Sequence, residues 1–224
     1  MKFEHTEVMN FEGAFRGMRN PMNSWAKSDS KITWEYGKAP HYEIGPNDMD
    51  LARRLISCGT EHRKFLRQVM VSVDITAPLY WWKEFDTYKV GTTANSTSTM
   101  HKLASTPITR ECFEMGDFED VTIEEVTHCY DELAFEYTTG NFVDEMIETL
   151  EQLRQKYNET KDKRYWKELI RWLPNGWLQT RTVTMNYENL RSMYHQREHH
   201  KLSEWHQFCD WVKSLPYADE LIIN

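Results

Sequence analysis

The side chains with the clearest chemical potential lie in a polar stretch from Gly91 to Thr99, in which seven of nine small residues carry a hydroxyl or an amide. Lys89 precedes this stretch, and an aromatic cluster begins at Tyr80. Small hydrogen-bonding groups beside a cation and aromatic rings are suited to lining a nucleotide pocket. Ser, Thr and Asn also favour turns and helix caps, so the alternative is a solvated loop that caps the next helix.

A second group of polar side chains lies in a segment near the C-terminal end that is expected to be helical: Arg191, Arg197, His195, His199, His200 and His206. The spacing of His195 and His199 along a helix can hold a metal. However, Gln196 stands where zinc proteases carry a glutamate. The four cysteines are scattered without a CxxC pair, so neither a zinc framework nor another metal site is expected.

A pair of arginines, Arg16 and Arg19, lies near the start of the chain. Arginines in a loop can bind a phosphate through paired hydrogen bonds, and ordinary surface charge is the alternative. The sequence contains neither a Gly-rich phosphate loop nor a nucleophile elbow.

The composition is that of a globular protein, with 40% hydrophobic and 28% charged residues. The formal net charge of −8 argues against nonspecific nucleic-acid binding, which needs a basic surface. Nine tryptophans indicate aromatic surface committed to a core, a pocket or a subunit interface. The sequence shows no signal-peptide core and no apolar run of membrane-spanning length. Together with the scattered cysteines, these features predict a soluble, cytoplasmic protein.

The polar stretch is expected to be positioned by the elements before it. Alternation of apolar and polar residues predicts a strand over 68–76 with one buried face. Pro78 then begins a predicted aromatic helix over 79–88. A further helical turn is expected around 99–103, directly after the polar stretch.

The N-terminal part is expected to contain one regular helix. Asn47 or Asp48 is predicted to cap this helix, and Gly59 to end it. Residues 1–46 are expected to be irregular with short pieces of strand or helix, because glycine and proline interrupt them too often for long elements.

The C-terminal half is expected to be mainly helical. The sequence Thr-Ile-Glu-Glu beginning at Thr122 is typical of a capping box, and predicts a helix that passes through Cys129, Tyr130 and Leu133 and stops at Gly140. Two further helices, a strand, and a long helix that is capped by Asn186 and broken near Leu202 are expected at 142–153, 165–170, 178–185 and 186–215.

Several short motifs follow one another along the chain: Gly59-Thr60-Glu61-His62, Ala77-Pro78, Lys83-Glu84-Phe85, Leu173-Pro174 and Asn186-Tyr187-Glu188-Asn189-Leu190. In this order they resemble the flavin-dependent thymidylate synthases, whose signature loop reads R-H-R-x-x-S-x-N-E-x-S-x-R. The resemblance extends from about Asp48 to Trp211.

The residues of the signature loop differ from that pattern in charge. The R-H-R triplet corresponds to Thr87-Tyr88-Lys89, and the remaining letters correspond to Thr92, Ala94, Asn95, Thr97 and Thr99. Arginine binds a phosphate through two parallel hydrogen bonds, which threonine cannot reproduce. Since a hydrogen bond to a charged group contributes about 1.5–3 kcal/mol, the active site is expected to be altered.

The resemblance implies a single α+β domain over residues 1–224, with a small, mostly antiparallel sheet packed with several α-helices, assembled as a homotetramer. It implies FAD as a cofactor, with NADPH and methylenetetrahydrofolate added only if the parent activity is retained. Arg197 corresponds to the family's closing arginine, which lies against the substrate pyrimidine, and is the expected catalytic residue. The expected nucleotide- or flavin-binding residues are Lys83, Glu84, Tyr88, Lys89, Thr92, Asn95, Thr97, Thr99, Asn186 and Arg197.

Three functions remain open from the sequence. The first is binding of a nucleotide or related ligand in an altered pocket at the subunit interface. The second is flavin-dependent C5-methylation of dUMP to dTMP using methylenetetrahydrofolate. The third is a non-catalytic role in assembly or ligand sequestration. For Arg197, the alternative to a site role is a salt bridge to Glu198 or Glu204 on the helix surface.

Overall fold

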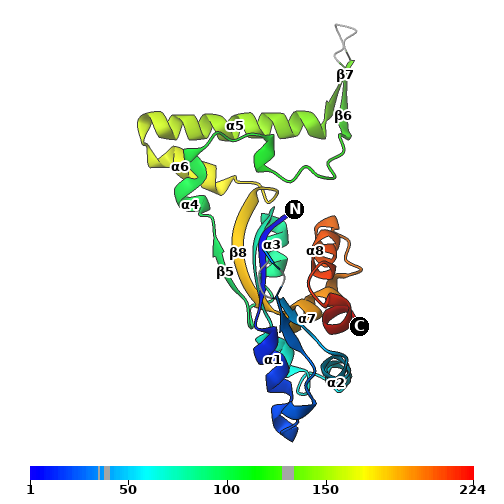
Figure 1. Ribbon diagram of the computed structural model, residues 1–224. Helices are drawn as coiled ribbons and strands as arrows, with labels where there is room; N and C mark the ends of the chain where they lie inside the picture. The colour runs from blue at the N-terminus through cyan, green and yellow to red at the C-terminus, as the bar shows by residue number, and fades with distance from the viewer. Residues whose placement is uncertain (35, 38–40, 128–133) are drawn as a thin grey trace. The chain divides into compact units, whose positions relative to one another are not determined.

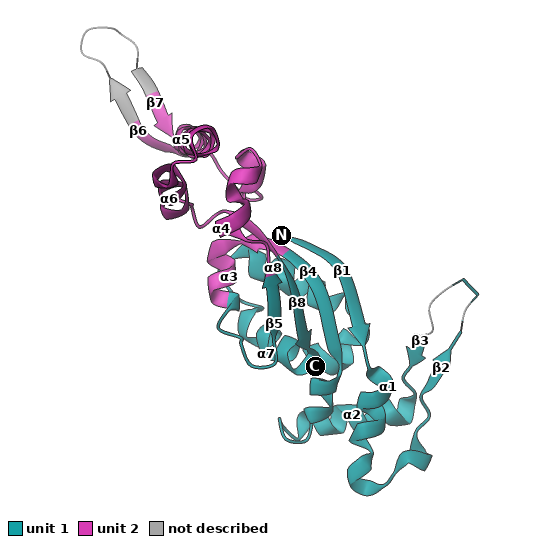
Figure 2. Ribbon diagram, turned by 90° about the vertical axis from the view of Figure 1, so that its left-hand side faces the viewer, with its two compact units in different colours: residues 1–75, 85–95, 181–224 teal, residues 76–84, 96–180 magenta. Residues whose placement is uncertain are grey.

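The computed structural model describes residues 1–34, 36–37, 41–127 and 134–224 (Figure 1). Within it the chain forms two compact units (Figure 2). Unit 1 comprises residues 1–75, 85–95 and 181–224, and unit 2 comprises residues 76–84 and 96–180. The expectation of a single domain over the whole chain stays a prediction.

The largest sheet has four strands in the order β1-β4-β8-β5. These strands are Lys2–Met9, Met70–Pro78, Leu178–Asn186 and Thr93–Ser96. Neighbouring strands run in opposite directions (Figure 2). Two small sheets, β2 with β3 and β6 with β7, are also antiparallel; their strands are Lys31–Thr33, His41–Glu43, Thr122–Thr127 and Ala134–Thr138. The prediction of an α+β fold with a small, mostly antiparallel sheet is confirmed.

Strand β4 follows the predicted alternation closely. Val71, Val73 and Ile75 are fully buried, whereas the residues between them are half-buried. Burying a side chain of this kind contributes about 1.5–3 kcal/mol. The period-two pattern therefore places one face of β4 in the core, as the sequence predicts.

Helix α8 packs over the sheet in unit 1. Phe208 of α8 lies 6.4 Å from Phe3 of β1 and 6.4 Å from Phe85, measured between ring centroids. Trp211 stacks on Phe3 at 5.1 Å. The predicted break in the C-terminal helix is confirmed, because α7 ends at Arg197 and α8 begins at Ser203. The helical elements of unit 1 are α1 Phe11–Met18, η1 Asn20–Met22, η2 Trp25–Lys27, α2 Pro46–Ser57, η3 Lys64–Gln68, α7 Tyr187–Arg197, α8 Ser203–Lys213 and η6 Asp219–Ile223.

The N-terminal segment contains short strands and helices, as predicted, and β1 is the longest strand among them. Strand β1 has eight residues, most of them exposed, so it lacks the apolar alternation by which a strand is recognised. Helix α1 contains two glycines and still forms. At Gly17 a Cβ atom would lie 3.0 Å from Oε1 of Gln68, which shows that this glycine permits a close approach of η3 rather than ending the helix.

The cap of helix α2 also differs from the prediction. The helix begins at Pro46, after Gly45. The backbone N–H groups of Asn47 and Asp48 donate to the side chain of Asp29, at 2.9 and 3.1 Å. Because Asp29 supplies the cap from a separate segment, the carboxylate of Asp48 is left for a buried ion pair.

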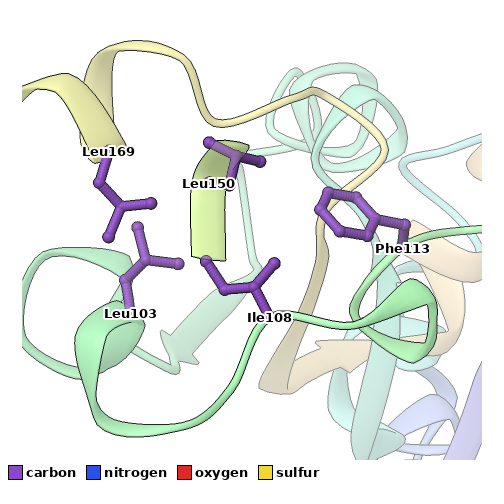
Figure 3. Packing of buried hydrophobic residues seen from close by; sticks show 5 residues of the cluster. All are labelled: Leu103, Ile108, Phe113, Leu150 and Leu169. Carbon is purple, nitrogen blue, oxygen red and sulfur yellow. The ribbon is translucent and has the colours of Figure 1, made fainter. Parts of the chain in front are cut away.

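Unit 2 has a small core of its own. Its buried side chains come from η4, α5, α6 and the segment between η4 and β6, and they are Leu103, Ile108, Phe113, Leu150 and Leu169 (Figure 3). Glu151 of α5 accepts a hydrogen bond from the N–H of Ile108 at 2.8 Å. The helical elements of this part are α3 Leu79–Phe85, α4 Thr99–Lys102, η4 Leu103–Ser105, η5 Arg110–Cys112, α5 Thr139–Thr160 and α6 Lys163–Arg171.

The helix predicted from Thr122 is wrong. This segment forms strand β6, in which Thr122 pairs with Thr138 and Glu124 with Tyr137, with a bulge between the two pairs. The capping box lies instead at Thr138, at the start of α5. The side chain of Thr138 accepts a hydrogen bond from the backbone N–H of Asn141, and the side chain of Asn141 accepts one from the backbone N–H of Thr138. Pairing with a distant strand overrides the local helix signal. Cys129, Tyr130 and Leu133 of the predicted helix lie outside the described residues.

A buried ion pair links the N-terminal segment to α2. Nε of Arg19 donates to Oδ1 of Asp48 at 2.5 Å, and the two side chains are 5% and 0% exposed. Ser28 and Ser30 donate to the other carboxylate oxygen. Burial raises the pKa of Asp48, but hydrogen bonds from Ser28, Ser30 and Arg19 outweigh it and hold the pKa below its usual range.

Replacing Asp48 by asparagine should lower the free energy of unfolding by about 3 kcal/mol at neutral pH, because Arg19 would stay buried without a counter-ion. A carboxylate with a lowered folded-state pKa stabilises the fold above its unfolded pKa of about 4, and this stability is lost as the pH falls through the folded-state value. Urea denaturation measures the free energy of unfolding of the variant and of the unmodified protein. The difference between the two should be smaller below pH 4 than at neutral pH. Asp50→Asn, which breaks an exposed pair with Arg54, should change stability by less than about 1 kcal/mol; equal losses for the two variants would contradict the assignment.

Candidate functional site

Arg197 lies at the end of α7 and is held by two aromatic side chains. Its Nε donates to the hydroxyl of Tyr88 at 2.8 Å. Its guanidinium carbon lies 5.5 Å from the ring centroid of Tyr88 and 4.6 Å from that of Trp205. Cation–π contacts of this kind contribute about 0.5–1 kcal/mol at exposed sites and more when water is excluded. We call Arg197, Tyr88 and Trp205 the Arg197 cage.

Tyr88 is itself fixed by its hydroxyl. It donates to Oε1 of Gln196 at 3.1 Å while it accepts from Arg197. Its ring meets that of Trp205 edge to face, at 6.2 Å between centroids. The hydroxyl therefore sets the orientation of the guanidinium, and the two rings support it.

The loop that carries Tyr88 and Lys89 is attached to the N-terminus of α7. Asn186 caps α7 by accepting from the N–H of Asn189 at 2.9 Å, which confirms the predicted cap. Asn189 in turn donates from Nδ2 to the carbonyl oxygen of Val90 at 2.8 Å. Gly91 has a φ of +79°, and a Cβ atom there would lie 3.0 Å from Oδ1 of Asn189. Only glycine meets both requirements without strain.

The arginines of this region are largely committed to protein partners. Arg181 pairs with Asp86 at 2.7 Å. Arg63 pairs with Glu188 at 2.9 Å. Arg191 donates to two backbone carbonyl oxygens near the C-terminal end, and burial lowers its pKa. Lys89, by contrast, is exposed and has no hydrogen-bond or ion-pair partner among the described residues, so its charge is available to an anionic ligand.

Four of the predicted site residues belong to unit 2. Lys83 donates from Nζ to Oδ1 of Asn175 at 2.7 Å, and Glu84 is half-buried. The backbone N–H of Thr97 donates to the carbonyl oxygen of Thr180 at 2.9 Å. Thr97 and Thr99 line a cavity of about 210 Å³ together with other hydroxyl-bearing residues of the segment 97–106.

The structure thus brings Tyr88, Thr92, Asn186 and Arg197 together in unit 1. Thr92 donates to the carbonyl oxygen of Tyr88 within the loop. Asn95 lies exposed on β5. The site roles predicted for these residues stay predictions.

Three residues that shape this region had no predicted role. Trp205 is fully buried and forms one side of the Arg197 cage. Gly91 and Asn189 join the loop to α7. The signal for Gly91 was present, since a glycine within a polar loop often marks a positive φ. No local signal identified Trp205, because its partners are distant in sequence.

The two arginines near the start of the chain and the histidines of α7 and α8 are the remaining polar candidates. Arg19 is buried in its pair with Asp48, so it cannot reach a phosphate, and Arg16 lies exposed near Glu12 at 3.6 Å. His195 lies 3.8 Å from Glu198. Across the described residues, no group of three or more His, Cys, Asp or Glu side chains is arranged to hold a metal.

Among the helices that the structure describes, none combines the length and apolarity needed to cross a membrane.

The fold is that of the flavin-dependent thymidylate synthases. The flavin dependent thymidylate synthase ThyX from Helicobacter pylori, solved in complex with FAD and dUMP, matches with a TM-score of 0.66 over 99% of this chain and 98% of that chain, at 14% sequence identity. A second structure of ThyX from Helicobacter pylori with FAD and dUMP matches with a TM-score of 0.61 over 96% of this chain and 94% of that chain, at 15% identity. The fold implied by the sequence resemblance is therefore confirmed.

A scan against models of protein families finds no match. A search of curated proteins also finds none.

Replacing Gly91 by alanine should lower the free energy of unfolding by about 1–2 kcal/mol, because a Cβ atom is strained at this positive φ and crowds Asn189. Urea denaturation of the two proteins measures the difference. Gly176→Ala is the matched control, since no atom lies within 4 Å of the added Cβ. Equal stability of Gly91→Ala and the unmodified protein would show that the loop is not fixed on α7.

Proposed function

We propose that the protein binds a pyrimidine nucleotide or a closely related ligand at the Arg197 cage and the loop before it, in a site altered from that of the flavin-dependent thymidylate synthases. The geometry of the Arg197 cage carries this proposal. A guanidinium that is oriented through Nε and supported by aromatic rings is a fixed planar cation, which is suited to contact a flat heterocycle. The shared fold supports it, because the similar Helicobacter pylori structures hold FAD and dUMP.

The proposal that the site differs from that of the flavin-dependent thymidylate synthases rests on the charges of the loop. Lys89 is an exposed ammonium on this loop, whereas Arg181 and Arg63 are paired with carboxylates. Thr92 and Asn95 offer neutral hydrogen bonds. This set of donors suits a single phosphate better than the pyrophosphate of FAD, which needs several cationic or bidentate contacts. We therefore propose a site that does not hold FAD.

The assembly and location belong to the same proposal. Large apolar side chains are exposed in both units, among them Trp34 at 75% and Trp172 at 65%. Exposed apolar surface of this kind is common where subunits meet. We infer a homotetramer with the ligand site near a subunit interface, located in the cytoplasm, where scattered cysteines stay reduced.

Arg197→Ala should weaken the binding of dUMP by about tenfold or more, since a hydrogen bond to a charged group contributes about 1.5–3 kcal/mol. Isothermal titration calorimetry with dUMP measures this change, and thermal shift verifies that the variant is folded. Arg164→Ala, which removes an exposed arginine paired with Asp162, is the matched control and should bind as the unmodified protein does. Absence of any dUMP binding at millimolar concentration in the unmodified protein would refute the proposal.

The purified protein should lack the visible absorbance of flavin, and should not retain it after incubation with FAD and desalting. The physical reason is that Lys89 is the only lysine or arginine in the loop from Asp86 to Thr99, whereas a pyrophosphate needs several cationic contacts. Absorbance spectra before and after incubation provide the measurement. A stoichiometric, retained flavin would instead support the flavin-dependent methylation of dUMP.

A further inference from the structure

A groove lies between α1 and the hairpin of β2 and β3, and we call it the α1–β3 groove. Both elements belong to unit 1 (Figure 2). The volume of the groove is about 390 Å³, which is within the range of about 300–1,000 Å³ that is usual for small-molecule sites. None of its lining residues belongs to the candidate site described above.

The walls of this groove are largely apolar. Phe11 lies on the α1 side, and its ring meets the rings of Tyr187 and Tyr217 edge to face, each at 5.5 Å between centroids. Tyr42 lines the β3 side and is half-buried. Ile32, which pairs with Tyr42 across the hairpin, also lines the groove and has 47% of its surface exposed. An apolar group placed against Ile32 would therefore remove apolar surface from water.

The hairpin is fixed to the rest of unit 1 through Tyr217. The hydroxyl of Tyr217 donates to the carbonyl oxygen of Tyr42 at 3.0 Å and accepts from the N–H of Ile44 at 3.2 Å. The ring of His41, which lines the groove, stacks on that of Tyr217 at 6.3 Å between centroids. The β3 wall is therefore held in place before a ligand binds, which lowers the entropic cost of binding.

Two opposite charges lie next to each other on the α1 side of the groove. Nη1 of Arg16 lies 3.6 Å from Oε1 of Glu12, and the two side chains are 67% and 58% exposed. This distance is too long for a hydrogen bond, and neither side chain has another partner among the described residues. A simple anion near Arg16 would be repelled by Glu12, and a simple cation near Glu12 by Arg16. The pair therefore favours a ligand that carries both signs of charge close together.

We propose that the α1–β3 groove binds a free α-amino acid with an apolar or aromatic side chain. The carboxylate of the ligand lies against Arg16, and its ammonium group lies against Glu12. Its side chain covers Ile32 and Tyr42. The ligand supplies the charge-assisted hydrogen bonds that Arg16 and Glu12 do not form with each other. This proposal does not depend on the function proposed for the Arg197 cage.

Fluorine NMR of para-fluorophenylalanine with the full chain provides the test, and unlabelled phenylalanine should displace this probe. Two analogues each lack one charge: phenylpropionate has no ammonium group, and phenylalaninamide has no carboxylate. Each analogue should compete at least about threefold more weakly than phenylalanine, as expected for the loss of one exposed charge pair.

Variants of the two charged residues assign each charge of the ligand. Arg16→Gln should weaken phenylalanine binding about threefold and remove its advantage over phenylalaninamide. Glu12→Gln should weaken it similarly and remove its advantage over phenylpropionate. Asp50→Asn and Arg54→Gln are the matched controls, because this exposed pair has the same spacing on α2 and does not line the groove. Both controls should bind phenylalanine as the unmodified protein does.

The apolar wall is tested through Ile32→Ser, which should weaken phenylalanine binding about fivefold because it removes half-exposed apolar surface. Circular dichroism verifies that each variant is folded. The proposal is wrong if phenylpropionate competes as strongly as phenylalanine, or if Arg16→Gln and Ile32→Ser bind phenylalanine as tightly as the unmodified protein. Absence of phenylalanine binding at millimolar concentration would also overturn it, and would leave the binding of dUMP at the Arg197 cage unaffected.

Discussion

The junction between β8 and α7 is the point on which the candidate site depends. Asn186 is the last residue of β8 and caps α7. The next residue, Tyr187, donates its N–H to Val69 at 3.0 Å and its hydroxyl to Pro216 at 2.7 Å. Burial raises the pKa of the Tyr187 phenol. Since buried donors must be paired, these bonds tie α7 to the residue that precedes β4 and to the C-terminal segment. Asn189 attaches the loop of Tyr88 to the same junction.

This junction explains how the loop keeps its position while its charges differ from the signature pattern. The loop is held by the hydrogen bond from Asn189 to the carbonyl oxygen of Val90 and by the close packing of Gly91 against asparagine side chains. Neither contact requires a bound ligand. Side chains such as Tyr88 and Lys89 are then free to differ without loss of the fold. Because the contacts that hold the loop are separate from the side chains that differ, the fold is kept at 14% sequence identity. A fold tolerates wide substitution when volume and patterning are kept.

The distribution of charge also supports a site that differs from the signature pattern. In the region of the candidate site, arginines are neutralised by carboxylates at Asp86 and Glu188. Arg197 is held by aromatic rings and a phenol hydroxyl. A cation held in this way is suited to a flat, weakly charged group, whereas the bidentate contacts that polyphosphates favour need free guanidinium groups.

By itself the sequence determined the elements whose signals are local. The alternation in β4, the start of α3 after Pro78, the cap of α7 at Asn186 and the break before Ser203 were all predicted correctly. The motif order also indicated the fold, and it identified Arg197 and Tyr88, which the structure places in contact.

Tertiary structure decided what depends on distant partners. Segment 122–127 forms a strand rather than a helix, because 134–138 pairs with it. Asp48 neutralises Arg19 instead of capping α2, because Asp29 supplies the cap from another segment. Trp205 became part of the Arg197 cage only through packing of α8 against the loop of Tyr88. Local propensity is a weak preference, and burial and hydrogen bonding between distant segments outweigh it.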